Sequence, residues 1–561
     1  MGAAPVGTRK EWDRNMKAYR ARIEKGRTLT EGGQGKIVDP SRAVALLETI
    51  IHPGDRVGLE GNNQKQAEFL ADCLCKVDLA KVHGLHMVQS AITLPAHCEI
   101  FERGIASKVD FAFSGPQAKP VARLLNEGKL KLGEIHTYLE LFSRYFIDLT
   151  PQVALVVGLQ ADRDGNLYTG ANTEDTPAIV EATHFKQGIV VAQVEKVVDK
   201  LPRVDIPGDW VDFVIPTGKP CYIEPLFTRD PASIRDMHIL MGMMVIKGIY
   251  GPYGLRSLNH GIGYAMSAIE LLLPTYAERL GLKGKICTHW ALNPHPTMIP
   301  AIESGFVETI HSFGSEVGTE AYVAARPDIF FVGPDGGMRS NRAFSQAAGH
   351  YAVDAFVGAT LQIDRYGNSS TATADRIAGF GGAPNMGCDA PGRRHSSGAW
   401  LKAGQESGIR EGLIGDMPRG RKLVIQLLET KTPKGNPCFV DRLDAWELMK
   451  RAGLAAPPVM IYGDAVTHIV SETGIAHLLR CVDLAERQDA IRAVAGDVGL
   501  GAEADPTKTA ALRKRGIVQT VADLGIDPAE ANGSLLAAHS IEDLMEWSGG
   551  LYDAPAQFRK K

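Results

Sequence analysis

The sequence lacks the features that mark membrane, secreted and nucleic acid-binding proteins. Its 561 residues hold no apolar run as long as the roughly 18 residues of a membrane-spanning helix. The first residues, MGAAPVGTRKEWDRNMKAYR, have no apolar core, so we expect no secretory signal. A formal net charge of −4 provides no general attraction for nucleic acid or an anionic membrane. We therefore expect a cytoplasmic protein with neither a membrane nor nucleic acid among its partners.

Motifs for metals and nucleotides are also missing. No C-x-x-C or H-E-x-x-H pattern occurs, so we expect no metal site and reduced thiols at the eight cysteines. The turn NHGIGYAMSA lacks the third glycine of a dinucleotide fingerprint, and the chain has no phosphate-binding P-loop motif. In HWALNPHP, His289 and His295 lie near each other without a carboxylate or cysteine in the same stretch, and we interpret them as loop histidines bound to polar backbone groups.

The sequence does contain a regular alternation of helix and strand patterns. VDPSRAVALLETII predicts a helix with Asp39 as its N-cap and Pro40 at its first position. The runs RVGLEG, ALVVGLQA, GIVVAQVEKVV, FFVG, DAFVGATLQI and KLVIQLL are short, apolar and β-branched, which is typical of buried strands. Strand, glycine turn and helix follow one another repeatedly, so we predict an α/β fold with parallel sheets.

An internal repeat indicates two similar halves. D-R-x-G-N follows a strand pattern at Asp162–Asn166 and again at Asp364–Asn368. GEIHTYLE is repeated as ETIHSFGSE, and LEGNNQKQAEFLADCL as NHGIGYAMSAIELLL, in matching order. Three recurrences in one order predict two similar open α/β domains, and a cleft between such halves is a natural ligand site.

The chain is expected to have four segments. They are an N-terminal helical arm (1–38), a first α/β domain (39–225), a second α/β domain (226–496) and a C-terminal helical appendage (497–561). The boundary between the two α/β domains is placed in PTGKPCYIEPLFTRDPASIRD, which is rich in proline and turn residues.

The loop AGFGGAPN is the first candidate for chemistry. Gly379, Gly381 and Gly382 flank Phe380, and glycines expose backbone N–H groups that side chains would cover. Two convergent N–H groups would form an oxyanion hole, the strongest aid to acyl transfer. The residues alone give equal weight to a tight turn that binds no ligand.

The stretch ETIHSFGSEVG is the second candidate. Its pattern predicts a strand running into a loop, so His311, Ser312 and Glu316 would lie at the carboxyl end of a strand, where open α/β sheets bind ligands. A structural histidine and a solvated carboxylate are the alternative readings. Ser312 lacks the G-x-S-x-G elbow of a serine hydrolase.

Several of these stretches together resemble the family I coenzyme A transferases. GDRVGLEG, GNLYTGANTEDTPAIVEAT, HGIGYAMSAIELL, IHSFGSEVG, DRYGN…GFGGAPN and THIVSETGIAHLL occur in the order of that family, over roughly residues 45–495. The resemblance implies two similar α/β domains and the exchange of a thioester between acids. It is strongest to members that act on an acyl carrier protein beside decarboxylase subunits, replacing acetate by malonate on the carrier thioester. In these, the thiol belongs to a dephospho-coenzyme A-type prosthetic group of the carrier, and we expect this chain to bind no cofactor of its own.

One residue departs from the family pattern. Many members have a nucleophilic glutamate directly after the His-Ser pair of this loop, and here that residue is Phe313. Either malonate attacks the acetyl thioester directly, giving a mixed anhydride that the thiolate then opens, or Glu316 acts as a displaced nucleophile. We favour direct exchange, with Phe313 filling the vacated volume.

The resemblance and the charge of malonate together suggest further site residues. Candidates for the distal carboxylate are His311, Ser312, Asn341, Arg342 and Arg376, with Asn385 beside the glycine loop. Candidates for the pantetheine arm or its phosphates are Gly61, Asn62, Asn63, Gly261, Ile262 and Gly263. Two alternatives stay open: a citrate-lyase-type α subunit or an enzyme acting on free coenzyme A, and a non-catalytic scaffold subunit.

Overall fold

The computed structural model describes residues 6–61, 65–219, 230–293, 295–312, 314, 316–333, 342–388, 399, 402 and 422–559. The chain forms two compact units, each assembled from separate stretches of sequence. Unit 1 comprises Met1–Glu224, Asn341–Ala343 and Asp375–Gly381; unit 2 comprises Pro225–Ser340, Phe344–Ala374 and Gly382–Lys561. In the described ranges, no helix has both the length and the apolar character to cross a lipid bilayer.

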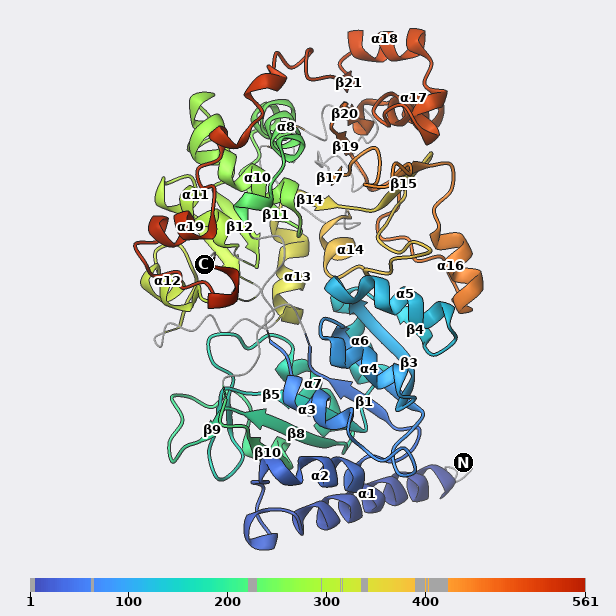
Figure 1. Ribbon diagram of the computed structural model, residues 1–561, viewed down its shortest axis with the longest axis vertical. Helices are drawn as coiled ribbons and strands as arrows, with labels where there is room; N and C mark the ends of the chain where they lie inside the picture. The colour runs from blue at the N-terminus through green and yellow to red at the C-terminus, as the bar shows by residue number, and fades with distance from the viewer. Residues whose placement is uncertain are drawn as a thin grey trace, which may run out of the picture. The chain divides into compact units, whose positions relative to one another are not determined.

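Unit 1 is built on a seven-stranded parallel sheet, which confirms the predicted class (Figure 1). In sheet order the strands are β10 (Phe213–Pro216), β8 (Ile189–Val194), β5 (Val153–Val157), β1 (Arg56–Leu59), β2 (Leu85–Ala91), β3 (Ala106–Phe113) and β4 (Lys131–Ile135). Its helices are α1 (Val6–Arg27), α2 (Ala43–Ile50), α3 (Glu68–Leu74), α4 (Pro95–Glu102), α5 (Ala118–Asn126), α6 (Tyr138–Ile147) and α7 (Thr176–Phe185). Every residue of β5 and β8 is buried, as expected for strands covered on both faces.

Unit 2 repeats this plan with an eight-stranded sheet. In order its strands are β13 (Thr309–Ser312), β12 (His289–Leu292), β11 (Ser257–His260), β14 (Ala355–Ala359), β17 (Leu423–Leu427), β19 (His468–Ser471), β20 (Gly474–His477) and β21 (Val518–Gln519). The strands from β13 to β19 are parallel, and β20 and β21 are antiparallel additions. The predicted strand FFVG is wrong: Phe330 makes only an isolated bridge to Ile310.

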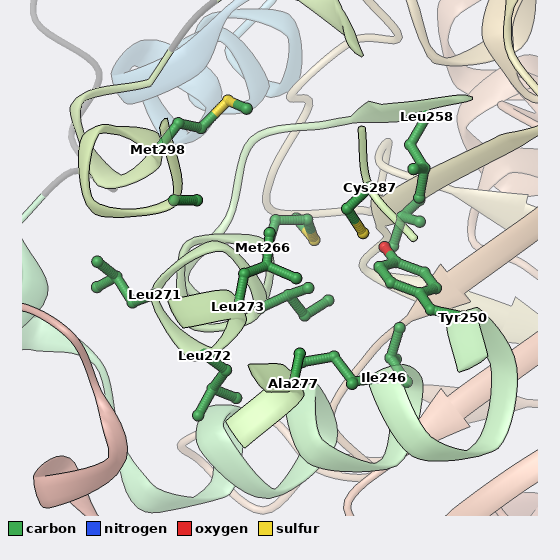
Figure 2. Close-up of a cluster of buried hydrophobic side chains, with 14 of the residues drawn as sticks. Ile246, Tyr250, Leu258, Met266, Leu271, Leu272, Leu273, Ala277, Cys287 and Met298 are labelled. Carbon is green, nitrogen blue, oxygen red and sulfur yellow. The ribbon is translucent and has the colours of Figure 1, made fainter. Parts of the chain in front are cut away.

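Helices surround the sheet of unit 2. They are α8 (Asp236–Val245), α9 (Gly251–Tyr253), α10 (Tyr264–Leu272), α11 (Ile299–Glu303), α12 (Glu320–Ala325), α13 (Arg342–Ala352), α14 (Ala383–Met386), α16 (Ala445–Ala452), α17 (Leu484–Ala493), α18 (Pro506–Lys514) and α19 (Ile541–Trp547). Figure 2 shows part of the buried core around α10, which includes Tyr250, Met266 and Cys287. The C-terminal stretch contributes helices, and it also adds β21 to the main sheet.

The D-R-x-G-N repeat has the same geometry in both units. In unit 1 the Asp162 carboxylate accepts bonds from the backbone and side-chain nitrogens of Asn166, at 2.9 and 2.7 Å. In unit 2, Asp364 and Asn368 make the same two bonds at 3.0 Å each. Each motif closes a hairpin, β6 (Gln160–Ala161) with β7 (Leu167–Tyr168) and β15 (Gln362–Asp364) with β16 (Ser369–Ser370). A parallel third strand completes each small sheet, so the predicted duplication is confirmed.

Candidate functional site

The carboxyl edge of the unit 2 sheet collects three of the predicted loops. Parallel strands β11, β12 and β13 end there, and they lead into the GIG turn, the ALNPHP loop and the IHSFGSEVG loop respectively. Ligands of open α/β sheets bind at this edge, because loops from neighbouring strands meet there and are free of ladder hydrogen bonds.

A buried carboxylate network fixes this edge. Glu270 of α10 is fully buried, and one of its oxygens accepts bonds from His260 Nδ1 and His295 Nδ1, each at 3.0 Å. Thr297 donates to the other oxygen, and Tyr250 bonds to His260 Nε2 at 2.7 Å. Burial opposes the charge, but the two histidines and their hydrogen bonds outweigh it and lower the pKa of Glu270. The interpretation of His295 as a histidine bound to backbone is therefore wrong.

The network joins α10 to the ends of β11 and β12. His260 is the last residue of β11, and His295 follows β12 in the loop ALNPHP. Since one carboxylate binds both imidazoles, the two loops that follow these strands are held together. No local sequence signal reveals this arrangement, because Glu270 and His295 are far apart in the chain.

The IHSFGSEVG loop is only partly open to solvent. His311 has an exposed position on β13. Protein atoms around its imidazole still remove part of the solvent, and this desolvation lowers the pKa of His311. The Ser312 hydroxyl accepts a bond from the Gly314 amide at 3.1 Å and donates to the Gly314 carbonyl, so it shapes the turn. Glu316 is 2% exposed, and Phe313 lies outside the described residues.

The glycine loop requires a correction. The amides of Phe380 and Gly381 both donate to the Ala112 carbonyl, at 2.7 and 2.9 Å, within unit 1. The Gly381 carbonyl in turn accepts from the Tyr138 amide at 3.1 Å. The prediction that these two amides hold an oxyanion is wrong for this structure, because both are already bonded to backbone.

Two polar side chains lie at the end of this loop: Asn385 of the loop itself and Gln346 of α13. The Asn385 Nδ2 atom is buried and has no hydrogen-bond acceptor among the described residues. The carboxamide of Gln346 on α13, which the sequence patterns did not single out, lies against Gly382, where a Cβ would come within 2.5 Å of its Oε1. Gln346 Oε1 is likewise buried without a donor in the described chain. Buried polar atoms of this kind are normally satisfied by water or by a bound ligand.

The predicted glycine turns are tightly built. Gly261 follows β11 and donates its amide to the Val357 carbonyl at 2.8 Å, so this amide is not available to a ligand. Gly263 has a φ of 153° at the start of α10, and Ile262 between the two is half-buried. In unit 1, Gly61 follows β1, and a Cβ there would come within 2.8 Å of the Ala91 carbonyl.

A second buried polar cluster lies beside Gly61. Lys65 Nζ is 3.4 Å from the Glu60 carboxylate, and both side chains are buried. Thr176 donates to Glu60 at 2.6 Å and accepts from Lys65. Desolvation raises the pKa of Glu60 despite the neighbouring lysine.

Several predicted site residues lie outside the part that can be described. They are Asn62, Asn63, Phe313 and Asn341, together with the side chain of Arg342, whose backbone begins α13. Arg376 is half-buried and belongs to unit 1.

Comparison with solved structures defines the class of this fold. An acyl-CoA transferase from Escherichia coli O157:H7 superposes with a TM-score of 0.52 at 13% identity, covering 80% of this chain and 89% of that one. The duplicated parallel sheets thus have the coenzyme A transferase fold. Residues 11–561 match the family described as malonate decarboxylase, alpha subunit, transporter, and the chain belongs to that family.

Two relatives are much closer in sequence. The acetyl-S-ACP:malonate ACP transferase of Malonomonas rubra is 64% identical over 523 residues, which cover 93% of this chain and 94% of the relative. A chain of the Pseudomonas malonate decarboxylase hetero-tetramer, whose crystal structure is a complex with malonate, is 54% identical with a TM-score of 0.92 over 100% of both chains.

Proposed function

We propose that this chain is an acyl-carrier-protein transferase that converts acetyl-S-carrier and malonate into malonyl-S-carrier and acetate. The observation that carries the proposal is its 64% identity, over nearly the whole chain, to an acetyl-S-ACP:malonate ACP transferase. The family match argues against the citrate-lyase-type alternative and against an enzyme acting on free coenzyme A.

The partners follow from the same relatives. We propose an acyl carrier protein with a dephospho-coenzyme A-type thiol as the second substrate, and decarboxylase subunits in a shared complex, since the Pseudomonas relative is part of a hetero-tetramer. This chain would bind no organic cofactor of its own. We place the reaction in the cytoplasm, because a reducing compartment keeps the carrier thiol free.

The proposed mechanism is direct exchange. A malonate oxygen attacks the acetyl carbonyl, the C–S bond breaks, and a thiolate and a mixed acetyl–malonyl anhydride form. The thiolate then attacks the malonyl carbonyl, and acetate leaves with the electrons of the anhydride C–O bond. Two observations support this route over a glutamyl intermediate: Phe313 stands where the family nucleophile would be, and Glu316 is 2% exposed, too enclosed in this conformation to meet a thioester.

The polar groups near AGFGGAPN would then bind the substrate charges. We propose Asn385 Nδ2 as a donor to the acid or to the tetrahedral oxyanion, in place of the bonded Phe380 and Gly381 amides. Within unit 2, exposed His311 is the candidate for the distal carboxylate. Arg376, half-buried in unit 1, stays a separate candidate. Gly382, packed against Gln346, keeps this loop close to α13.

The test is acetate release from acetylated carrier in the presence of labelled malonate. Glu316→Gln should keep appreciable turnover, and hydroxylamine after incubation with acetyl-carrier should leave Glu316 unmodified by mass spectrometry. Glu308→Gln, an exposed glutamate before the same loop, is the matched control. Direct exchange would be refuted if a hydroxamate formed at Glu316 and if Glu316→Gln lost turnover while the control Glu308→Gln kept it. Failure of the unmodified chain to exchange the acids would instead favour the scaffold alternative.

A further inference from the structure

A histidine in unit 1 is oriented by a buried aspartate. Asp110 of β3 accepts a bond from His136 Nε2 at 2.8 Å and from His86 Nε2 at 2.6 Å. The Asp110 carboxylate is the acceptor in both bonds. Both imidazoles must therefore carry a proton on Nε2. A neutral His136 then has its lone pair on Nδ1.

The Nδ1 atom of His136 faces two more carboxylates. The imidazole is fully buried, and Nδ1 has no hydrogen-bond partner among the described residues. Glu140 Oε1 lies 3.6 Å away and Glu134 Oε2 lies 4.0 Å away. Both distances exceed a hydrogen bond, so an imidazolium N–H would reach neither oxygen well. A lone pair without a donor, with two carboxylate oxygens nearby, is an arrangement that a metal ion would complete.

We propose that Glu134, His136 and Glu140 form a binding site for a divalent transition-metal ion such as Zn²⁺. Their three ligand atoms lie within 4.8 Å of one another. A tetrahedral Zn²⁺ with bonds of about 2.1 Å would hold nitrogen and oxygen roughly 3.4 Å apart, which needs only small shifts from the observed distances. One imidazole and two carboxylates leave a position for water, as in open zinc sites.

The surroundings match an outer shell for such an ion. The Asp110 bond to Nε2 is the carboxylate–histidine–metal arrangement that fixes the ring and raises ligand basicity. Arg144 holds the Glu134 carboxylate, and the Thr137 amide donates to Glu140 Oε2 at 3.4 Å.

The repeat supplies an internal comparison. In the matching stretch of unit 2, the histidine is retained as His311, but Thr309 and Ser315 stand where unit 1 has Glu134 and Glu140. The carboxylates thus accompany only the copy in which the histidine is buried. Gly133, beside them, is required for close packing, because a Cβ there would come within 1.9 Å of Asp110 Oδ2.

The proposed ion would connect the end of β4 to the start of α6. That junction also binds the glycine loop: Thr137 forms a bridge with Gly381, and the Tyr138 amide donates to the Gly381 carbonyl. A metal at His136 would therefore stiffen the backbone against which residues 379–381 are ordered.

The experiment is metal titration of the full-length chain after chelator treatment, by calorimetry with Zn²⁺ and by absorption with Co²⁺. We expect one equivalent bound with a nitrogen–oxygen Co²⁺ spectrum, free of thiolate charge transfer. Glu134→Gln/Glu140→Gln should lower the affinity at least about tenfold. Glutamine can still complete the Thr137 capping box, so α6 should stay intact.

Glu99→Gln, which alters an exposed i,i+4 pair on α4, is the control and should bind as the unmodified chain does. Zn²⁺ should also raise the unfolding temperature of the unmodified chain and of this control, but not of the double variant. Equal affinity in the double variant, a thiolate-type spectrum, or no binding by the unmodified chain would overturn the proposal.

Discussion

Replacement of Glu270 should weaken unit 2 more than any exposed substitution. Its carboxylate is fully buried and is bonded to His260, His295 and Thr297. Removing one partner of a buried charged network costs about 3–5 kcal/mol, because the remaining polar groups are left without water or partner. Glu270→Ala should therefore lower the unfolding temperature of unit 2 by on the order of 10 °C.

Glu270→Gln should be milder. The carboxamide keeps the volume and one acceptor oxygen, but its NH₂ group replaces the second acceptor. Loss of a charge-assisted hydrogen bond predicts about 1.5–3 kcal/mol. Fluorescence of Trp290, whose ring contacts His260 edge-on with centroids 4.6 Å apart, reports on this region during thermal or denaturant unfolding.

The pH dependence gives a second readout. The folded-state pKa of Glu270 is lowered from the ordinary value of 4.5, so its stabilisation is present above that value and is lost as the pH falls below it. The unmodified chain should lose stability in this window more steeply than Glu270→Gln. Glu278→Gln, which alters an exposed pair with Lys283, is the control. The stabilising role of the network would be refuted if Glu270→Gln had the same unfolding midpoint as the unmodified chain and the same dependence of stability on pH.

Three further perturbations test other features. Lys65→Met should lower the free energy of unfolding by about 3–5 kcal/mol, because buried Glu60 loses its cation. Adding Glu60→Gln should restore much of that free energy in denaturant unfolding. A double variant as unstable as Lys65→Met would count against a paired role. Gly318 has a φ of 84°, and a Cβ there would lie 2.0 Å from the Asp553 carbonyl oxygen, so Gly318→Ala should displace the C-terminal residues. The Asp553 N–H donates to the Gly318 carbonyl and should then exchange with solvent faster. Unaltered exchange would contradict this packing. Asn385→Ala should lower acid exchange on the carrier by about 10²-fold, as expected for loss of an oxyanion donor, and turnover near that of the unmodified chain would remove Asn385 from the site.

Sequence patterns predict the strands of this fold well because burial on both faces demands short apolar, β-branched runs. β5 and β8 illustrate this, since each is fully buried and each has an unmistakable run. The D-R-x-G-N turns are equally predictable, because Asp and Asn bond within five residues of one another. FFVG has the right composition for a strand, yet composition does not reveal whether a neighbouring strand is free to pair.

The site is less predictable, because its geometry depends on partners far apart in sequence. Nothing local to Phe380 shows that its amide is bonded to Ala112. In the same way, His295 has no carboxylate beside it in the chain, and only the fold brings Glu270 to it. The His136 cluster had a local signal, with glutamates two residues before and four residues after the histidine, but it resembles no standard metal motif.

The assignment of residues 375–381 to unit 1 bears on how the protein is made. The N-terminal part of unit 1 ends at Glu224, yet residues 377–381 supply backbone partners for Ala112, Ser114 and Tyr138. A ribosome adding 5–20 residues per second would deliver this segment on the order of ten to thirty seconds after Glu224. Until then the backbone groups of Ala112, Ser114 and Tyr138 lack these partners. A fragment that ends at Glu224 should therefore be less stable than the complete unit 1.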